Sequence, residues 1–406
     1  MNEIFQNLYE MTAFSNIIAE PQFLIMYAIA FVLLYLGIKK QYEPLLLVPI
    51  AFGVLLANFP GGDMGVIQAD ENGLINVHGV MRNIWEMPLH DIAHELGLMN
   101  FIYYMLIKTG FLPPIIFMGV GALTDFGPML RNLRLSIFGA AAQLGIFTVL
   151  LVAILMGFTP KEAASLGIIG GADGPTAIFT TIKLAPHLLG PIAIAAYSYM
   201  ALVPIVQPFA IRLVTTKKAR RIRMPAKPAR PVTKTTRILF PIIVTFLVGL
   251  ISPASVSLVG FLMFGNLLRG CGVLGNLSDT AQTSLANLIT LLLGITISFS
   301  MRAEQFVTKE TLLILVIGLF AFVMDTIGGV LLAKFMNLFL KKKINPMIGG
   351  AGISAFPMSS RVVQKMAMEE DPTNVILMQA AGANVSGQIA SVIAGGMVIN
   401  LVTKFL

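Results

Sequence analysis

One acidic residue, Asp173, lies in a stretch of the sequence with the composition of a cation site inside a membrane. The stretch covers residues 166–181, reads LGIIGGADGPTAIFTT, and lies between segments that are apolar and long enough to cross a bilayer. It includes Gly170, Gly171, Gly174 and Pro175. Because glycine frees the backbone and proline removes an amide donor, an unbroken membrane helix is not expected here. A broken helix or re-entrant hairpin is expected, since its opened backbone leaves carbonyl oxygens free beside the carboxylate. The alternative is an extramembrane turn with a solvated aspartate.

A second interruption occurs at the comparable place in the other half of the chain. Residues 344–361 read INPMIGGAGISAFPMSSR and include Ser354. A long apolar segment with a polar residue inside it follows each interruption, with Tyr199 after the first and Asn384 after the second. Paired interruptions are typical of membrane proteins built from pseudo-symmetric repeats, whose binding site lies where the two breaks meet near the bilayer midplane. We therefore expect two inverted repeats, each with a broken helix or re-entrant hairpin.

Asp173 and polar residues of the second half together predict a site for a sodium ion. Such a cation is bound by several hard oxygen atoms, much as calcium is. Asp173 offers the negative charge, while the hydroxyl of Ser354 and the amides of Asn345 and Asn384 offer neutral oxygens. The same carboxylate can carry a proton instead. For Ser354 and Asn384 the alternative is hydrogen bonding between helices, and both interpretations stay open.

Arg361 ends the second interruption and is the candidate for binding an organic anion. Its guanidinium matches two carboxylate oxygens at once. The competing interpretation is one more arginine on the cytoplasmic side, where the positive-inside rule expects it. Charge at membrane depth is costly and needs a partner. The other charged residues expected at such depth are Asp125, Arg131, Arg302, Glu304 and Asp325.

The composition is that of an all-α polytopic membrane protein. Of the 406 residues, 56% are hydrophobic and 12% are charged, and the mean hydropathy is +0.83; soluble domains have about 25% charged residues. No cleavable signal peptide is expected. The single cysteine, Cys271, excludes an intramolecular disulfide and a cysteine-based metal cluster. The net charge of +8 is concentrated in short loops, which indicates membrane topology rather than nucleic-acid binding. The phosphate-binding motif GxxxxGK[ST] of ATP-driven motors does not occur.

The same pattern divides the chain into four parts. An N-terminal segment, 1–21, is expected at the membrane interface, and a first membrane half, 22–213, holds the broken stretch 166–181. The linker 214–237 is crowded with Lys and Arg, broken by prolines, and expected in the cytoplasm. A second membrane half, 238–406, holds the broken stretch 344–361. The expected spans are about 22–38, 44–59, 97–124, 135–158, 188–213, 238–251, 254–268, 285–299, 311–340 and 375–403.

Long motifs of this sequence resemble the beta subunit of the sodium-pumping, biotin-dependent decarboxylases. They are GALTDFGPML, GGADGPTAIFTTIKLAPHLLGPIAIAAYSYMALVPIVQPFAIRLVTTKKAR, NPMIGGAGISAFPMSSRV and DPTNVILMQAAGANVSGQI. That family comprises the oxaloacetate, methylmalonyl-CoA and glutaconyl-CoA decarboxylases of anaerobic bacteria. The resemblance runs from about residue 20 to the C-terminus. It implies a carboxybiotin decarboxylase in the cytoplasmic (inner) membrane of a bacterium, with a scaffold domain and a moving core.

The resemblance also implies roles for the residues that match the family's own. The family's sodium-binding coupling acid falls on Asp173 and its tyrosine of the AYSYMALVP helix on Tyr199. Catalytic roles then fall on Asp173, Tyr199 and Arg361. Carboxybiotin binding falls on Arg361, Asn345 and Gly349. Sodium binding falls on Asp173, Ser354, Asn345 and Asn384.

Partners follow from the same resemblance. A biotin carrier or carboxyltransferase subunit brings carboxybiotin from the cytoplasm, its decarboxylation drives sodium outward, and a proton from outside is consumed. Small gamma-type membrane subunits and a trimer of this chain within membrane lipid are implied as well. The alternative is a secondary transporter that exchanges sodium for protons or co-transports an organic anion. A structural subunit without chemistry is disfavoured by Asp173 in its glycine-rich setting.

Overall fold

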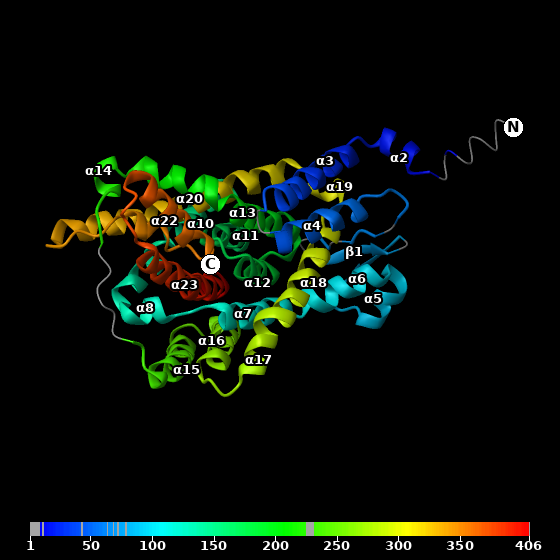
Figure 1. Ribbon diagram of the computed structural model, residues 1–406. Coiled ribbons are helices and arrows are strands. Elements are labelled where there is room, and N and C mark those ends of the chain that lie inside the picture. Colours follow the sequence, from blue (N-terminus) through cyan, green and yellow to red (C-terminus); the bar gives the residue numbers. More distant parts are fainter. Residues whose placement is uncertain are drawn as a thin grey trace. The chain divides into compact units, whose positions relative to one another are not determined.

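Helices form nearly all of the regular structure of the chain (Figure 1). This computed structural model describes residue 9 and residues 12–41, 44–62, 64–67, 69–70, 73–77, 79–224 and 231–405. Within these ranges the one sheet is an antiparallel hairpin, in which β1 (Leu74–Val77) pairs with β2 (Val80–Asn83). The all-α class expected from the composition is confirmed. The N-terminal segment 1–21 and the linker 214–237 lie partly outside the described residues.

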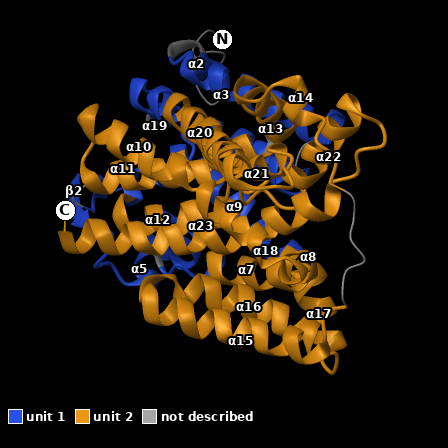
Figure 2. Ribbon diagram, turned by 90° about the vertical axis from the view of Figure 1, so that its left-hand side faces the viewer, with its two compact units in different colours: residues 1–112, 186–191, 287–314 blue, residues 113–185, 192–286, 315–406 orange. Residues whose placement is uncertain are grey.

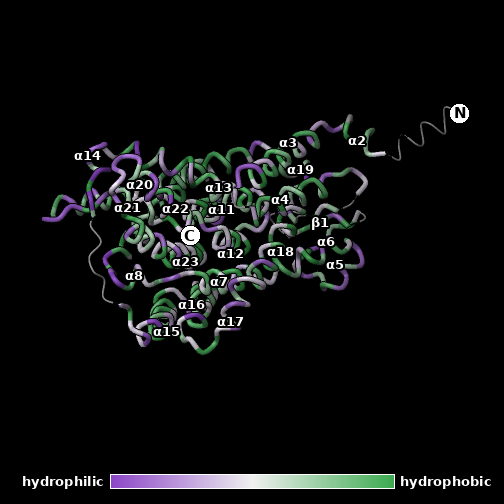
Figure 3. The backbone as a smooth tube through the Cα atoms, in the orientation of Figure 1, coloured by the Kyte–Doolittle hydropathy of each residue, from purple (hydrophilic) through white to green (hydrophobic). Residues whose placement is uncertain are grey.

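Six helical segments of the described chain are long and apolar enough to cross a bilayer, which takes about 20 helical residues. They are Gln22–Lys39, Leu133–Leu155, Lys234–Ile251, Gly275–Phe299, Lys309–Phe339 and Leu377–Phe405. Two interrupted apolar stretches, 98–123 and 186–214, bring the number to eight if each is one span. The long helices are mostly apolar along their length (Figure 3). The chain is thus a multi-pass membrane protein, as expected.

Contacts along the chain divide it into two compact units (Figure 2). Unit 1 comprises Met1–Leu112, Pro186–Pro191 and Asn287–Ile314. Besides the hairpin, it contains α2 (Ala13–Ala19), α3 (Gln22–Leu34), η1 (Tyr35–Lys39), α4 (Pro44–Ala57), α5 (Leu89–Leu96), α6 (Leu98–Tyr103), η2 (Tyr104–Lys108), η5 (Pro186–Leu188), α19 (Ala303–Phe306) and nearly all of α18 (Ala286–Phe299). The expected span 44–59 corresponds to α4.

Unit 2 comprises Pro113–Ala185, Ile192–Ala286 and Leu315–Leu406. Up to residue 185 it contains α7 (Leu112–Leu123), α8 (Gly127–Arg131), η3 (Leu133–Leu135), α9 (Ser136–Ala141), α10 (Leu144–Leu155), α11 (Pro160–Gly167), η4 (Ile168–Gly171) and α12 (Gly174–Leu184). Its later elements are α13 (Leu189–Val214), α14 (Lys217–Arg220), α15 (Lys234–Ile251), η6 (Pro253–Ser255), α16 (Val256–Gly270), α17 (Gly275–Thr280), η7 (Ala281–Leu285), α20 (Lys309–Phe339), α21 (Met347–Gly350), α22 (Met358–Glu370) and α23 (Leu377–Phe405). Helices α7, α13 and α20 begin in unit 1. The four-part division and the pseudo-symmetric repeats remain predictions.

Unit 2 brings its central helices together at glycines. A Cβ atom added at Gly349 of α21 would lie 2.0 Å from the carbonyl oxygen of Gly329 in α20. One added at Gly387 of α23 would lie 2.1 Å from the oxygen of Gly352. Small residues permit this close backbone approach, and membrane helices use it where no hydrophobic force drives them together. The contacts fix α20, α21 and α23 around the segments that carry the buried polar groups.

Candidate functional site

The first interrupted stretch is a break between two helices, with the acid at the start of the second. Thr159 begins α11 with a capping box, in which its hydroxyl accepts from the amide of Glu162 while the Glu162 carboxylate accepts from the Thr159 amide. After η4 the chain passes Ala172 in the left-handed conformation, with φ +52°, and restarts as α12. Asp173 caps α12 by accepting from the amide of Thr176 at 3.5 Å. Its negative charge therefore lies at the positive end of that helix.

The two interrupted stretches touch each other. In the second one, α21 ends at Gly350 and α22 begins at Met358, so that residues 351–357 are not helical. The backbone amide of Ser354 donates to the carbonyl oxygen of Gly171 at 3.0 Å. Non-helical backbone is tolerated at membrane depth only where protein groups satisfy it, and here one backbone group of each break is satisfied by the other break.

Three hydroxyl groups converge on a single oxygen of Asp173. Its Oδ2 accepts from Oγ1 of Thr176 at 2.8 Å, from Oγ of Ser354 at 3.2 Å and from Oγ of Ser391 at 2.6 Å. Asp173 is only 6% exposed, and none of the ion pairs within the described residues involves it. A buried carboxylate with hydroxyl neighbours and no basic partner is suited to a proton or a small hard cation.

The neighbouring oxygens can serve as ligands as well as donors. Each hydroxyl that now donates to the carboxylate can rotate its O–H bond. When a cation binds beside the carboxylate, the hydroxyl then turns an oxygen lone pair toward that cation. Asn384 of α23 adds a further oxygen, because its Nδ2 donates to the carbonyl of Ile353 at 2.7 Å while its Oδ1 is buried without a hydrogen-bond partner among the described residues. Ile353 directly precedes Ser354, so the amide group of Asn384 lies beside the second break.

Two of these groups, Thr176 and Ser391, were not singled out from the sequence. A signal for each exists. Thr176 follows the capping Asp173 at the third helical position, where a side chain reaches back to the cap. Ser391 follows Asn384 by seven residues, which is two turns along the same face of one helix.

The tyrosines of α13 have different surroundings. Tyr199 donates its hydroxyl hydrogen to the carbonyl oxygen of Leu315 in α20, so its partner is not Asp173. The ring of Tyr197 packs on Gly174, since a Cβ added there would lie 2.2 Å from its Cε1 atom. In the part of the chain that the structure describes, the buried Tyr197 hydroxyl has no hydrogen-bond partner. Tyr197, which sequence analysis passed over, is therefore the tyrosine that contacts the residue after Asp173.

Asn345 and Gly349 lie at the entrance to the second break and have partners of their own. The amide of Asn345 donates to the carbonyl oxygens of Arg220 at 2.7 Å and Ile222 at 3.0 Å, and its Oδ1 accepts from Met347. Gly349 lies against Gly329. Neither belongs to the hydroxyl set around Asp173, and their assignment to substrate or sodium stays a prediction.

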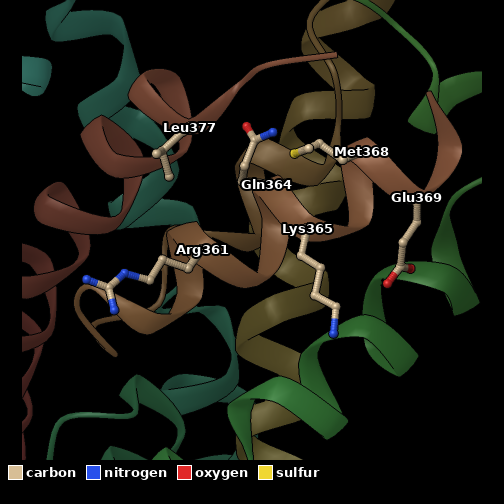
Figure 4. Close-up of a pocket in the computed structure, with 6 residues that line it drawn as sticks. All are labelled: Arg361, Gln364, Lys365, Met368, Glu369 and Leu377. Atoms are coloured by element: carbon tan, nitrogen blue, oxygen red, sulfur yellow. The ribbon is translucent and has the colours of Figure 1, made fainter. Parts of the chain in front are cut away.

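Arg361 lines a cleft of about 450 Å³ along α22 (Figure 4). Arg361, Lys365 and Glu369 extend from one side of that helix, spaced one turn apart. Glu369 is paired with Arg212 at 3.1 Å, whereas the charged groups of Arg361 and Lys365 have no ion-pair partner within the described residues. Two unpaired cations one helical turn apart make this cleft suitable for an anionic guest.

Comparison with known proteins assigns the family. The family model described as the Na+-transporting oxaloacetate decarboxylase beta subunit matches residues 22–402. The chain belongs to this family. The methylmalonyl-CoA decarboxylase subunit beta of Propionigenium modestum is 50% identical over 382 residues, covering 93% of this chain and 94% of that protein. The oxaloacetate decarboxylase beta chain 2 of Salmonella typhi is 45% identical over 411 residues, covering 93% and 94%. The methylmalonyl-CoA decarboxylase subunit beta of Veillonella parvula is 46% identical over 380 residues, covering 94% and 93%.

Membership of the beta-subunit family confirms the resemblance recognised from the sequence motifs. The family is one of sodium-transporting decarboxylases, so a decarboxylase and sodium-pump role is established at that level. The designation as a beta subunit places the chain in a complex of several subunits. The multi-pass membrane fold agrees with a location in the bacterial inner membrane.

Proposed function

We propose that this chain decarboxylates carboxybiotin presented by a biotin carrier and couples the reaction to sodium export across the cytoplasmic membrane. A proton taken from outside is consumed. The observation that carries the proposal is the buried Asp173 carboxylate with three converging hydroxyls, at the point where two helix breaks share a hydrogen bond. Its setting in a family of sodium-transporting decarboxylases supports sodium as the cargo.

Asp173 would hold sodium together with Ser354, Ser391 and Thr176, and the free Oδ1 of Asn384 would complete the ligand set. All five side chains offer hard oxygens, which sodium prefers. A single carboxylate among neutral ligands leaves the loaded site nearly neutral, so that the ion can both enter and leave. When sodium departs, a proton on Asp173 restores neutrality, because a bare charge at this depth is costly.

Carboxybiotin would bind in the cleft of α22 with its carboxylate on the Arg361 guanidinium and Lys365 nearby. Arg361 and Ser354 lie seven residues apart on one continuous stretch, so a shift of α22 on substrate binding reaches the sodium ligand directly. This connection supports coupling between the cleft and the ion site.

The reaction itself needs little from the protein beyond a proton. The bond between the ureido nitrogen and the carboxyl carbon breaks, carbon dioxide leaves, and the electron pair that remains on nitrogen takes up a proton. Tyr199 is our candidate for relaying that proton, and the unpartnered hydroxyl of Tyr197 is the second candidate on the same helix. The proton consumed in the reaction is the one that leaves Asp173 when sodium binds there.

The partners we propose are a biotin carrier or carboxyltransferase subunit on the cytoplasmic side, a small gamma-type membrane subunit, and further copies of this chain in a trimer. Arg361 and Lys365 give the cleft the positive charge that a carboxylated biotin requires. The family designation as one subunit of several supports such an assembly.

The test compares Asp173→Asn with Asp279→Asn in proteoliposomes that contain the whole complex. Asp279 is exposed, and its carboxylate accepts a local hydrogen bond from Gln282 while its carbonyl accepts one from Thr283. We expect Asp173→Asn to lose both sodium-dependent decarboxylation of carboxybiotin and sodium uptake, and Asp279→Asn to keep both. Sodium uptake of wild-type size by Asp173→Asn would refute the role of this acid. Sodium movement by the wild-type chain without carboxybiotin would favour the secondary transporter instead.

A further inference from the structure

A second carboxyl group, that of Asp325, is buried beside the first helix break. Asp325 lies near the middle of the 31-residue helix α20 and is fully buried. Its Oδ1 accepts from the backbone amides of Gly145 and Ile146 at the start of α10, at 3.2 Å for Ile146. Its Oδ2 is buried and has no hydrogen-bond partner within the described residues.

Glycines on both sides make room for this carboxyl group. A Cβ atom added at Gly145 would lie 2.4 Å from Oδ1, and one added at Gly170 would lie 2.9 Å from Oδ2. Gly170 belongs to η4, the four-residue segment that leads into Asp173. The unpartnered oxygen of Asp325 therefore faces the backbone that positions the proposed sodium ligand.

The surrounding elements offer Asp325 no counter-charge. Helix α10 and segment η4 contain no charged or titratable residue, and α11 has its charges, Lys161 and Glu162, in its first turn. Helix α13, which bonds to α20 through Tyr199, has its one charged residue, Arg212, in its last turn, and its tyrosines carry no positive charge. On α20 itself the other charged residues are Lys309, Glu310 and Lys334, the nearest nine positions away. The next acid beyond η4 is Asp173.

A proton is the occupant that this setting fits. A buried carboxylate oxygen without a donor or a basic partner is strongly disfavoured, so Oδ2 requires a cation or a proton. A metal ion needs several oxygen ligands. No side-chain oxygen of the described residues is hydrogen-bonded to Asp325, in contrast to the three hydroxyls at Asp173. A proton needs only Oδ2 itself.

We propose that Asp325 is a proton-binding site, which holds one proton on Oδ2 and is linked through η4 to the sodium site at Asp173. Only the link to Asp173 rests on the proposed function; the proton site itself does not. With its proton the carboxyl is neutral and its O–H can donate to the backbone of the break; without it, a negative charge faces Gly170. Proton and sodium thus act on one short stretch of backbone, the proton at Gly170 and the sodium at Asp173 three residues later, and each changes the affinity for the other.

The first experiment is infrared difference spectroscopy of the purified complex at pH 7, wild type minus Asp325→Asn. We expect a C=O stretching band of a protonated carboxylic acid, shifted by added sodium in the wild type but not when Asp173→Asn is the parent. A difference spectrum with carboxylate bands alone would overturn the proton site. An acid band that sodium leaves unchanged, in a wild type whose Asp173 carboxylate bands do respond to sodium, would overturn the link to Asp173. If the sodium role of Asp173 is wrong, the carboxylate bands that are missing from Asp173→Asn do not respond to sodium in the wild type, so the two failures are distinguishable.

The second experiment measures turnover. Asp325→Asn keeps the Oδ1 acceptor for Gly145 and Ile146, so it removes the proton site while retaining the positioning contact. We expect at least a tenfold loss of sodium-dependent carboxybiotin decarboxylation with an unchanged thermal unfolding midpoint. The matched control is Thr326→Val, which alters the adjacent buried hydroxyl of α20, bonded to Phe322, and should change neither quantity. Wild-type turnover with a wild-type pH profile in Asp325→Asn would overturn the proposal.

Discussion

At Asp173, one carboxylate oxygen has more donors than lone pairs. An ionised carboxylate oxygen offers about two acceptor sites, and Thr176, Ser354 and Ser391 all direct hydroxyls at Oδ2. At any moment one of the three hydroxyls is therefore not needed as a donor, and it can rotate its hydrogen away from Oδ2. The crowding of hydroxyls around a single oxygen therefore favours a bound cation, around which all three oxygens can serve at once.

Ser391→Ala tests this ligand set. Loss of one hydroxyl removes about 1 kcal/mol of hydrogen bonding or coordination, which corresponds to a rise of roughly five- to tenfold in the sodium concentration for half-maximal decarboxylation. The measurement is a sodium titration of turnover. Ser386→Ala is the control, since Ser386 is equally buried on α23 but bonds to the carbonyls of Leu135 and Ala383. Equal sodium requirements in Ser391→Ala and the wild type would contradict the assignment.

Arg361→Gln tests the cleft. Removing a charge-assisted contact of about 1.5–3 kcal/mol should raise the carboxybiotin concentration for half-maximal rate by roughly 10- to 100-fold while leaving the sodium requirement nearly unchanged. Lys365→Gln, one turn away in the same cleft, should have the smaller effect because a lysine makes no bidentate contact. If Arg361→Gln raised the sodium requirement more than the carboxybiotin requirement, Arg361 could not be assigned to carboxybiotin binding.

Part of this site could be predicted from residue types alone. Asp173, Ser354 and Asn384 were recognisable because a charge or polar group in an apolar, glycine-rich setting is unusual. The helix positions of Thr176 and Ser391 are a signal in the sequence, but hydroxyl residues are common in membrane helices, and only the folded contacts show which of them face an acid. Tyr197 is not recognisable from the sequence for the same reason, as its distance to Gly174 depends on the packing of α12 against α13.

At the scale of elements, the helix breaks could be predicted and their partners could not. Gly170, Gly171 and Pro175 interrupt a helix by local backbone chemistry, which a sequence displays directly. The bond between Ser354 and Gly171 joins residues far apart in the chain, so no local pattern reveals it. The crossing of α20 and α21 at two facing glycines is of the same kind.

Gly349→Ala probes that crossing. The added methyl group would lie 2.0 Å from the oxygen of Gly329, and separating the two backbones is expected to destabilise the protein by about 1–3 kcal/mol. The expected result is a lower thermal unfolding midpoint in detergent. Gly260→Ala in α16 is the control, because its added atom meets nothing nearer than 3.8 Å and a helix interior prefers alanine. Unfolding midpoints that fall equally in both variants would contradict the packing argument.

The C-terminal end of α22 is held by ion pairs, from which a pH dependence of the protein's stability can be predicted. Arg212, Arg220 and Arg223 pair with Glu369, Glu370 and Asp371. The hydrogen bond from the Arg223 guanidinium, assisted by Thr373, lowers the pKa of Asp371 to about 2. Because this pKa is depressed, the contribution of the pair is complete above the unfolded pKa of about 4 and is lost as the pH falls toward 2.

The difference in unfolding midpoint between the wild type and Asp371→Asn should therefore be constant from pH 7 to pH 5 and shrink below pH 4. Denaturation of the detergent-solubilised protein at several pH values measures it. A difference that already shrinks between pH 7 and pH 5 would show that another group governs the pair.

At the scale of the whole molecule, composition determined the class and long-range contacts determined the organisation. The apolar content and the clustering of Lys and Arg predict a multi-pass membrane protein with a cytoplasmic linker. Each compact unit is assembled from three separate chain segments. A linear pattern of apolar stretches does not show such interleaving, because it arises from contacts between residues hundreds of positions apart.

The single cysteine, Cys271, allows the predicted orientation of the chain to be tested in the unaltered sequence. Helix α15 rises about 27 Å over its 18 residues, turns at η6, and α16 returns beside it. Their far ends meet, since a Cβ atom added at Gly270 would lie 3.1 Å from the carbonyl oxygen of Arg237. Cys271 is therefore on the same membrane side as the basic linker, which the positive-inside rule puts in the cytoplasm.

A membrane-impermeant maleimide should accordingly label Cys271 in inverted vesicles and not in intact cells. Moving the thiol to the opposite turn, with Ala254→Cys in a Cys271→Ser background, should reverse the pattern, because residue 254 lies at the other end of both helices. Labelling of Cys271 in intact cells would place the linker, the α22 cleft and its Arg361 on the outer side. A carrier-borne carboxybiotin made in the cytoplasm could not then reach the cleft, and the proposed direction of sodium transport would have to be reversed.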